Sequence, residues 1–301
     1  MNKKQFEIRV PGSTSNIGPG FDSIGVALNL YLTVHCEESD EWLFVQKNSS
    51  DQHLPTGKDN LLYECARFAA QKFGYDQLPP YRVEVDSEIP IARGLGSSGA
   101  ITVAGIELAN QILNLDLSLK DKMLIASELE GHPDNVTPSI AGGCVVAYYN
   151  EENLYYIGKT GMEKVDFVAM IPSFELRTKM AREILPEELP FMQGIQGSAI
   201  GNVCTAAIFQ EDYALLGKVM EKDLFHQNYR KKFIPHYHEM TEYMKNEGAY
   251  GTFLSGAGPT MMSICERGLP ANREQEWNRV YPDFEWRILK VEDQGVMVEK
   301  K

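Results

Sequence analysis

The feature that most constrains this sequence is a glycine- and serine-rich turn at residues 94–98, Gly-Leu-Gly-Ser-Ser, which joins a predicted strand to a predicted helix. Residues 81–86 alternate apolar and polar side chains, which is typical of a strand, and the apolar residues of 101–112 are spaced as one face of a helix. The two glycines permit positive φ and let a ligand approach the backbone closely. Consecutive N–H groups at a helix N-terminus stabilise an anion, so the turn predicts a phosphate site.

A tight turn with a serine N-cap would contain the same residues, and this turn alone leaves both interpretations open. The Walker sequence GxxxxGK[ST] is absent. Two further glycine-rich segments favour a binding site. They are residues 16–22, Asn-Ile-Gly-Pro-Gly-Phe-Asp, and residues 254–260, Leu-Ser-Gly-Ala-Gly-Pro-Thr.

The composition is that of an ordinary globular protein, with 43% hydrophobic and 24% charged residues among 301. A formal charge of −13 argues against nucleic-acid binding, because a net acidic surface repels phosphate backbones. The five cysteines are scattered, as expected of reduced, buried thiols. The first ten residues have no apolar signal-peptide segment, and no apolar run approaches the roughly 20 residues of a spanning helix. We therefore expect a cytoplasmic protein without membrane contact.

The order of predicted elements indicates an α+β fold with two layered domains. Helices are predicted over residues 60–73, 118–130, 179–185, 198–209 and 235–246. Strands are predicted over residues 6–10, 24–34, 145–149, 167–171 and, as a pair, 251–264. The segment 151–164 is polar and contains two glycines, and we place the domain boundary there, giving domains of residues 1–158 and 159–301.

Taken together, the three glycine-rich segments resemble the GHMP kinase superfamily, and its homoserine kinase family in particular, over nearly the whole chain. The motifs that match are residues 11–22, 90–100, 130–136, 178–182, 228–230 and 255–260. Ser15 and Gly99 depart from the alanines usual in the family without removing a functional group. The resemblance implies an N-terminal domain like ribosomal protein S5 domain 2 and a C-terminal ferredoxin-like domain. It also implies ATP-dependent phosphorylation of the side-chain hydroxyl of L-homoserine, a step of threonine biosynthesis.

The resemblance implies that ATP binds in a cleft with its phosphates on the glycine loop. The residues expected to bind it are Asn60, Pro90, Ile91, Ala92, Arg93, Gly94, Leu95, Gly96, Ser97, Ser98, Gly99 and Ala100. Asn60 also suits an ordinary helix N-cap, and the two roles are compatible.

A pair of acidic residues, Glu128 and Glu130, falls in the last turn of a predicted helix, where the helix dipole disfavours negative charge. A Mg²⁺ ion shared with phosphates would offset this cost, although solvent exposure would also make it small. The resemblance favours Glu130 as the metal ligand, with Ser98 beside it, and leaves Glu128 as the alternative.

The short loop after Glu130 carries His132, Asp134 and Asn135. The resemblance places His132 at the acceptor substrate, while the register of this loop stays open. Positioning and charge neutralisation carry most of phosphoryl transfer when the transition state is loose. We therefore expect Asn135 to orient the acceptor hydroxyl, and Asp134 either to assist catalysis or to hold the loop.

An amino-acid substrate needs a cation for its carboxylate and an acid or amide for its ammonium. Arg182 and Arg230 suit the carboxylate because a guanidinium forks onto it, while Asp22 and Asn16 suit the ammonium. The resemblance adds Thr178 and Gly256 to this substrate site.

Both arginines could instead be surface residues, because most arginines in proteins are exposed to solvent. The neighbouring Lys231 and Lys232 favour that interpretation for Arg230.

Other kinases and a non-catalytic protein of the same fold are the alternatives. The HGxPSGxD-type segment of mevalonate kinases, the GRxNLIGEHTDY-like opening of galactokinases and the longer glycine run of diphosphocytidyl-methylerythritol kinases are absent. A non-catalytic relative should have lost Ser98, Glu130 or the glycines at 94 and 96, and all are present. The oligomeric state is left open, with a homodimer as one option.

Overall fold

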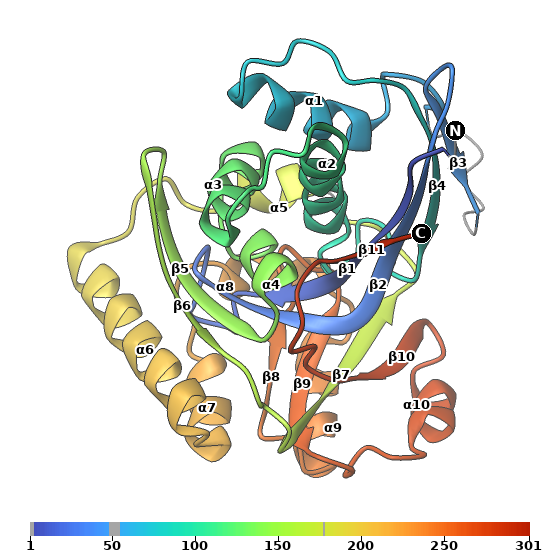
Figure 1. The fold of residues 1–301 in the computed structure, drawn as a ribbon. Helices are drawn as coiled ribbons and strands as arrows, with labels where there is room; N and C mark the ends of the chain where they lie inside the picture. Colours follow the sequence, from blue (N-terminus) through green and yellow to red (C-terminus); the bar gives the residue numbers. More distant parts are fainter. Residues whose placement is uncertain (1–2, 48–54, 177) are drawn as a thin grey trace.

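Two β-sheets organise the structure, a computed structural model that describes residues 3–47, 55–176 and 178–301 (Figure 1). Within the described residues, the first sheet has the strand order β11-β1-β2-β4-β3, with β5 paired to β2 and β6 paired to β5. Its strands are β1 Gln5–Ser15, β2 Ile24–Glu38, β3 Leu43–Gln46, β4 Tyr81–Ser87, β5 Cys144–Asn150, β6 Asn153–Lys159 and β11 Met297–Lys300.

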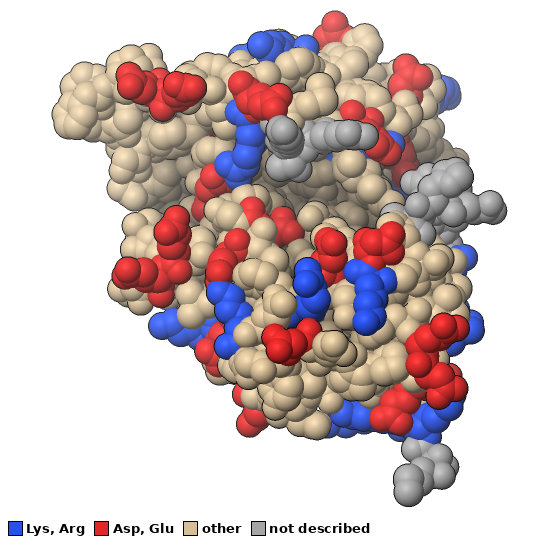
Figure 2. Space-filling model, turned by 90° about the horizontal axis from the view of Figure 1, so that it is seen from above, with Lys and Arg blue, Asp and Glu red and all other residues tan. Residues whose placement is uncertain are grey.

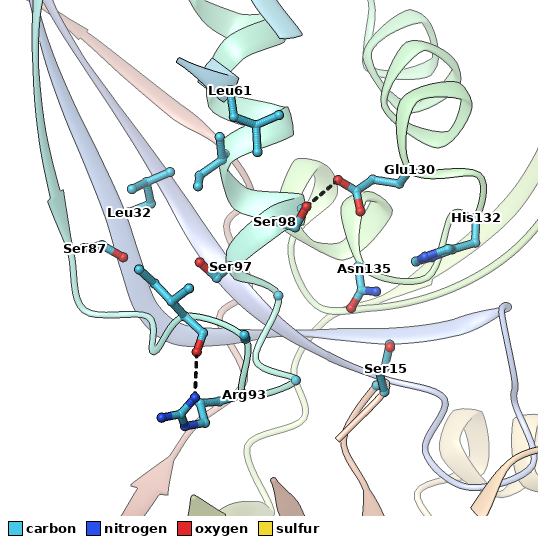
Figure 3. A pocket seen from close by; sticks show the side chains of 18 of the residues that line it. Ser15, Leu32, Leu61, Ser87, Arg93, Ser97, Ser98, Glu130, His132 and Asn135 are labelled. Carbon is cyan, nitrogen blue, oxygen red and sulfur yellow. Dashed lines mark hydrogen bonds between the residues drawn. The ribbon is translucent and has the colours of Figure 1, made fainter. Parts of the chain in front are cut away.

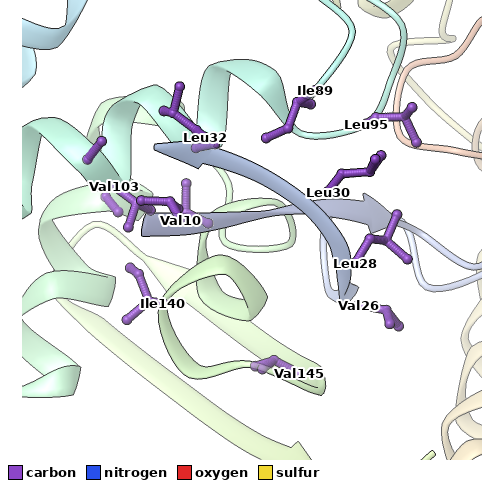
Figure 4. Packing of buried hydrophobic residues seen from close by; sticks show 14 of the residues in the cluster. Val10, Val26, Leu28, Leu30, Leu32, Ile89, Leu95, Val103, Ile140 and Val145 are labelled. Carbon is purple, nitrogen blue, oxygen red and sulfur yellow. The ribbon is translucent and has the colours of Figure 1, made fainter. Parts of the chain in front are cut away.

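The long strand β2 is the centre of this sheet. It pairs with β1, then with β5 through residues 24–26 and with β4 through residues 32–38. Its inward side chains pack with those of β1 and of the helices above them, as the buried residues Val10, Leu28, Leu32 and Val103 show (Figure 4). Burial of such side chains is the main stabilising term of this half of the molecule.

Four helices cover one face of the first sheet (Figure 1). They are α1 Leu61–Lys72, α2 Ser97–Leu113, α3 Leu119–Glu130 and α4 Val136–Ala141. Helix α2 is buried along most of its length and packs between α1, α3 and α4. The helix that begins at the glycine turn is therefore fixed from several sides, which fixes the turn as well.

The second sheet is antiparallel, in the order β10-β7-β9-β8. Its strands are β7 Val165–Pro172, β8 Gly251–Leu254, β9 Met261–Glu266 and β10 Phe284–Leu289. The helices of this half are α5 Thr178–Glu183, α6 Phe191–Gln210, α7 Tyr213–Met220, α8 Gln227–Arg230 with a 3₁₀ turn at Lys231–Phe233, α9 Tyr237–Asn246 and α10 Glu274–Val280.

The predicted α+β class is confirmed, and the predicted strands and helices form as the expected types. Strands β3, β6, β10 and β11 and helices α4, α7, α8 and α10 were not predicted. The polar segment 151–164 contains strand β6, and helix α6 begins at Phe191, earlier than predicted. The last strand, β11, returns to pair with β1, a partner that no local pattern could reveal.

The change from the first sheet to the second falls between β6 and β7, and the division at residue 158 stays a prediction. All five cysteines are free and buried, as expected. No described helix has the length and apolar character needed to cross a membrane. Acidic and basic side chains are interspersed over the described part of the face seen in Figure 2.

Candidate active site

A cavity of about 570 Å³ lies where the two halves of the chain meet (Figure 3). Its walls come from the β1–β2 connection, the start of α2, the loop after α3, and helices α5 and α8. Most of the expected site residues line this cavity. They include Asn16, Asp22, Asn60, Gly94, Gly96, Ser97, Ser98, Glu130, His132, Asn135, Arg182, Arg230 and Gly256. Asp134, Ile91, Ala92, Arg93 and Gly99 line it too.

Hydrogen bonds join the three glycine-rich segments to one another. The backbone N–H of Ser13 donates to Leu95 O (3.1 Å), and the Ser255 hydroxyl donates to Gly94 O (2.6 Å). Asn16 Nδ2 donates to Gly256 O (3.0 Å). Segments that are 80 to 240 residues apart in sequence therefore form a single structural unit.

The glycines of the phosphate-type loop are required by this geometry. Gly94 and Gly96 have φ of 79° and 77°, and a Cβ at Gly94 would lie 2.3 Å from Ser255 O. Gly96 is the N-cap of α2 and offers no side chain to its first N–H groups. The start of a 17-residue helix thus faces the cavity with its partial positive charge, which suits an anion.

Three residues expected to bind nucleotide do not line the cavity. Leu95 and Ala100 are buried in the core, and Pro90 lines a separate hollow near β10. Arg93 lines the cavity, but its guanidinium donates to the carbonyls of Pro172 and Ser173 and so ties the loop to the end of β7.

An apolar wall at one side of the cavity was not foreseen. It consists of Leu32, Leu61, Leu62, Val85, Ile91 and Ile101. Asn60 lies beside it and caps α1, accepting from Leu62 N (3.0 Å) and donating to Pro55 O (2.7 Å). The N-cap role of Asn60 is confirmed, and the wall offers a flat apolar group a place to bind.

Glu130 faces the start of α2. Its Oε1 accepts hydrogen bonds from Ser98 (3.0 Å) and Thr102 (2.7 Å). Thr102 was missed by the sequence analysis, although its position one turn after Ser98 places it on the same helix face. Glu128 instead pairs with Lys72 and does not line the cavity, so of the two carboxylates Glu130 is the one placed to hold a cation there.

His132 and Asp134 form a buried pair, with 2.5 Å between Nδ1 and Oδ1. Burial alone would lower the pKa of His132, but the hydrogen bond and charge of Asp134 raise it overall. Burial would likewise raise the pKa of Asp134, and the hydrogen bond and charge of His132 lower it overall. Both shifts therefore favour the ionised form of the pair, with a protonated His132 beside a charged Asp134.

Arg182 and Asp22 form a bidentate ion pair at the end of the cavity that holds His132 and Asp134, with N–O distances of 2.7 and 3.1 Å. Ligating atoms of Asp22, His132 and Asp134 lie within 4.8 Å of one another. With Arg182 they make a network of alternating charges. The side chain of Thr178, the neighbouring expected residue, lies outside the described residues.

Arg230 is 2% exposed, so the interpretation of this residue as a surface arginine is wrong. Its guanidinium donates to Ala181 O (2.9 Å), Gly256 O (3.2 Å) and His226 Nδ1 (3.3 Å). Burial and the neighbouring Arg182 charge lower the pKa of Arg230 to about 10, which still leaves it charged at neutral pH. A buried cation at the cavity wall favours an anionic partner.

Two aromatic rings support the arginines. Phe21 stacks on His226 with 5.2 Å between ring centroids, and the guanidinium carbons of Arg182 and Arg230 lie 5.6 and 5.3 Å from the Phe21 centroid. Burial lowers the pKa of His226, so its neutral ring accepts from Arg230 and donates to Gly18 O (2.9 Å). Sequence reasoning missed both rings, although His226 precedes Arg230 by one helical turn.

Comparison with known proteins agrees with this geometry. Family models described as GHMP kinases N terminal domain and GHMP kinases C terminal match residues 60–143 and 204–283. A homoserine kinase of Halalkalibacterium halodurans is 44% identical over 98% of this chain and 95% of its own length, and one of Bacillus velezensis is 43% identical with the same coverage. The crystal structure of a Cytophaga hutchinsonii homoserine kinase superposes with a TM-score of 0.85 and 25% identity, covering 98% of this chain and 97% of its own.

The fold, the glycine loop and these matches define a class, and the chain belongs to the GHMP kinases. Relatives that are 43–44% identical over nearly the full length place it more narrowly in the homoserine kinase family. The resemblance seen in the sequence motifs is confirmed.

The His132–Asp134 pair leads to a pH prediction. Asp134→Asn should lower the pKa of His132 below its ordinary value of about 6.5, because burial persists while the opposing charge is lost. Asp22→Asn should lower it less, since the Asp22 charge contributes less than the hydrogen bond and charge of Asp134. NMR titration of the imidazole measures both shifts.

The directions of these two pKa shifts also determine the pH range in which the pair stabilises the fold. The raised His132 pKa adds stability that is complete below about pH 6.5 and is lost as pH rises through the folded value, and the lowered Asp134 pKa adds stability that is lost as pH falls through its folded value. An unchanged His132 pKa in Asp134→Asn would contradict the assignment.

Proposed function

We propose that this protein transfers the terminal phosphoryl group of ATP to the side-chain hydroxyl of L-homoserine, giving O-phospho-L-homoserine. The observation that carries the proposal is one cavity with a glycine-rich anion site at one end and paired cationic and anionic side chains at the other. The homoserine kinase names of the full-length relatives support the choice of acceptor.

We propose that the phosphates of ATP bind against residues 94–98 and the N-terminus of α2. The apolar wall of Leu32, Leu61 and Val85 suits the purine ring, with Asn60 at its edge. Binding there would leave the terminal phosphoryl group toward Asn135 and the acceptor end of the cavity.

We propose that Glu130 and Ser98 hold Mg²⁺. A carboxylate and a hydroxyl are hard oxygen donors of the kind this ion prefers, and both lie at the start of α2. When bound, Mg²⁺ supplies charge neutralisation of the phosphates. Thr102 holds the Glu130 carboxylate from one side and so fixes its orientation.

At the acceptor end, we propose that Arg230 and Arg182 bind the substrate carboxylate and that Asp22 faces the ammonium. Asn16 and Gly256 shape this end, because Asn16 Nδ2 and an Arg230 N–H both donate to Gly256 O. The lowered pKa of Asp134 makes it a weak base, which favours a positioning role for this residue. Asn135 would then orient the acceptor hydroxyl for in-line transfer.

We also infer that the protein acts in the cytoplasm, where ATP and amino-acid precursors are available.

Acceptor choice provides the test of the function. With Mg·ATP, ADP release should be much faster with L-homoserine than with L-serine, mevalonate or galactose, because the full-length relatives are homoserine kinases and the cavity carries paired charges suited to an amino acid. A coupled ADP assay over these alcohols measures this. Faster turnover of mevalonate or galactose than of homoserine would refute the proposal.

The metal assignment predicts a second result. Glu130→Gln should lower kcat by about 10²-fold or more, because the side chain loses its negative charge. The melting temperature should stay near that of the unmodified protein, because glutamine keeps the shape of the glutamate side chain. Glu128→Gln, two residues away but outside the cavity, is the matched control and should keep its kcat. Near-normal kcat for Glu130→Gln at ordinary Mg²⁺ would exclude Glu130 as a ligand.

The acceptor site predicts a third result. Arg230→Ala should reduce kcat/KM for homoserine by on the order of 2–5 kcal/mol, because the substrate carboxylate loses a buried partner. KM for ATP should change far less, and Arg230→Lys should recover only part of the loss because lysine cannot form the fork.

Lys232→Ala is the matched control for Arg230→Ala, since Lys232 lies two residues away and does not line the cavity. Wild-type kcat/KM for homoserine in Arg230→Ala, or a loss confined to ATP, would rule out this acceptor site.

A further inference from the structure

The orientation of the buried Arg230 guanidinium is set by three hydrogen-bond acceptors. Two are backbone carbonyls, Ala181 O at 2.9 Å and Gly256 O at 3.2 Å, and the third is His226 Nδ1 at 3.3 Å. Among the described residues, His226 is the only side chain that accepts a hydrogen bond from Arg230. The carbonyls belong to any sequence that follows this chain path, so the imidazole is the acceptor that the residue type decides.

The imidazole of His226 is fixed by its backbone and by packing. The side chain is fully buried, and its ring stacks on Phe21 with 5.2 Å between centroids. The Asp223 carboxylate accepts from the backbone N–H groups of Phe225 (2.9 Å), His226 (2.9 Å) and Gln227 (2.6 Å). The ring is therefore in place before a ligand binds, which lowers the ordering cost of binding.

The second ring nitrogen fixes the tautomer. Nε2 lies 2.9 Å from Gly18 O, which can only accept, so Nε2 carries the hydrogen and Nδ1 keeps its lone pair for Arg230. Burial lowers the pKa of His226 against the opposing charge of Asp223, and the charge of Arg230 adds to the lowering. The neutral ring is the form that can accept from a guanidinium.

His226 also connects two segments of the acceptor end. Gly18 and Phe21 belong to the connection between β1 and β2, which also carries Asp22, whereas Arg230 ends helix α8 one turn after His226. The ring thus contacts the segment that carries the proposed ammonium partner and also the proposed carboxylate partner. An α-amino acid has its ammonium and carboxylate on one carbon, so a site for both needs a fixed spacing between its anion and its cation.

We propose that His226 is a positioning residue of the acceptor site, which holds the Arg230 guanidinium at the spacing from Asp22 that an α-amino acid requires. The role rests on the proposed function, because it requires an acceptor that carries both charged groups. His226 does not line the cavity and acts through Arg230. Without the Nδ1 lone pair, one buried N–H group of Arg230 would lack this acceptor, and the guanidinium would lose its fixed orientation.

Two substitutions separate the roles of the two ring nitrogens. In His226→Asn the amide oxygen can take the place of Nδ1, so Arg230 keeps an acceptor while the contact with Gly18 is lost. In His226→Gln the amide NH₂ group can take the place of Nε2, so the contact with Gly18 is kept while Arg230 loses its acceptor. Both variants lose the stack on Phe21, so each is the matched control for the other.

Kinetics with two alcohols provide the test. With Mg·ATP, His226→Gln should lower kcat/KM for L-homoserine by about 10-fold or more, the size expected for a hydrogen bond to a charged group. KM for ATP, and kcat/KM for 3-amino-1-propanol, which is homoserine without its carboxylate, should change by less than about twofold. His226→Asn should keep most of the kcat/KM for homoserine.

A double variant tests whether His226 acts through Arg230. Adding His226→Gln to Arg230→Ala should have little further effect on kcat/KM for homoserine, because the arginine that the histidine positions is already absent. Full additivity of the two losses would contradict the assignment.

NMR of the imidazole nitrogens in the wild-type chain covers the case in which a variant fails to fold. At neutral pH, His226 should be the neutral tautomer with its hydrogen on Nε2. A hydrogen on Nδ1, equal losses in the two variants, or equal losses for homoserine and 3-amino-1-propanol would overturn the role of His226. A wild-type chain that does not phosphorylate homoserine would refute the proposed function itself, which the other outcomes leave intact.

Discussion

The structure depends on the hydrogen bonds that hold three glycine-rich segments together. Gly94 O, Leu95 O and Gly256 O accept from Ser255, Ser13 and Asn16, and these contacts fix the loop that precedes α2. Loops that bind ligands through backbone N–H groups need such fixation, since a mobile loop would lose conformational entropy on binding. The close approach also explains the glycines, because a Cβ at Gly94 or Gly96 would overlap a neighbouring segment.

The proposed acceptor end of the cavity is built around a buried charge, that of Arg230. Burying Arg230 has a high desolvation cost, which three hydrogen bonds and the nearby Asp22 carboxylate partly offset. Neutral His226 is one of these acceptors and stacks on Phe21, which in turn lies under both guanidiniums. A preorganised cation of this kind binds a carboxylate without further ordering of the site.

Phe21 lines both this cavity and the hollow between α6 and the β5–β6 hairpin, so the two regions share a side chain. The surface of α6 therefore has a structural connection to the site, although the two regions have opposite chemical character.

The sequence alone determined the α+β class, most helices and strands, and the chemical nature of the loop at 94–98, because periodicity and glycine placement are local properties. It also predicted Glu130 as a metal ligand, through the family resemblance, and Asp22, Arg182 and Arg230 as a substrate site. Tertiary structure alone decided that Arg230 is buried, that Glu128 faces away from the cavity, and that Leu95 and Ala100 serve the core. It also decided that β11 pairs with β1 and that α6 leaves an apolar stripe exposed. These facts depend on which distant segments meet, and that is set by the packing of the whole chain rather than by any local pattern.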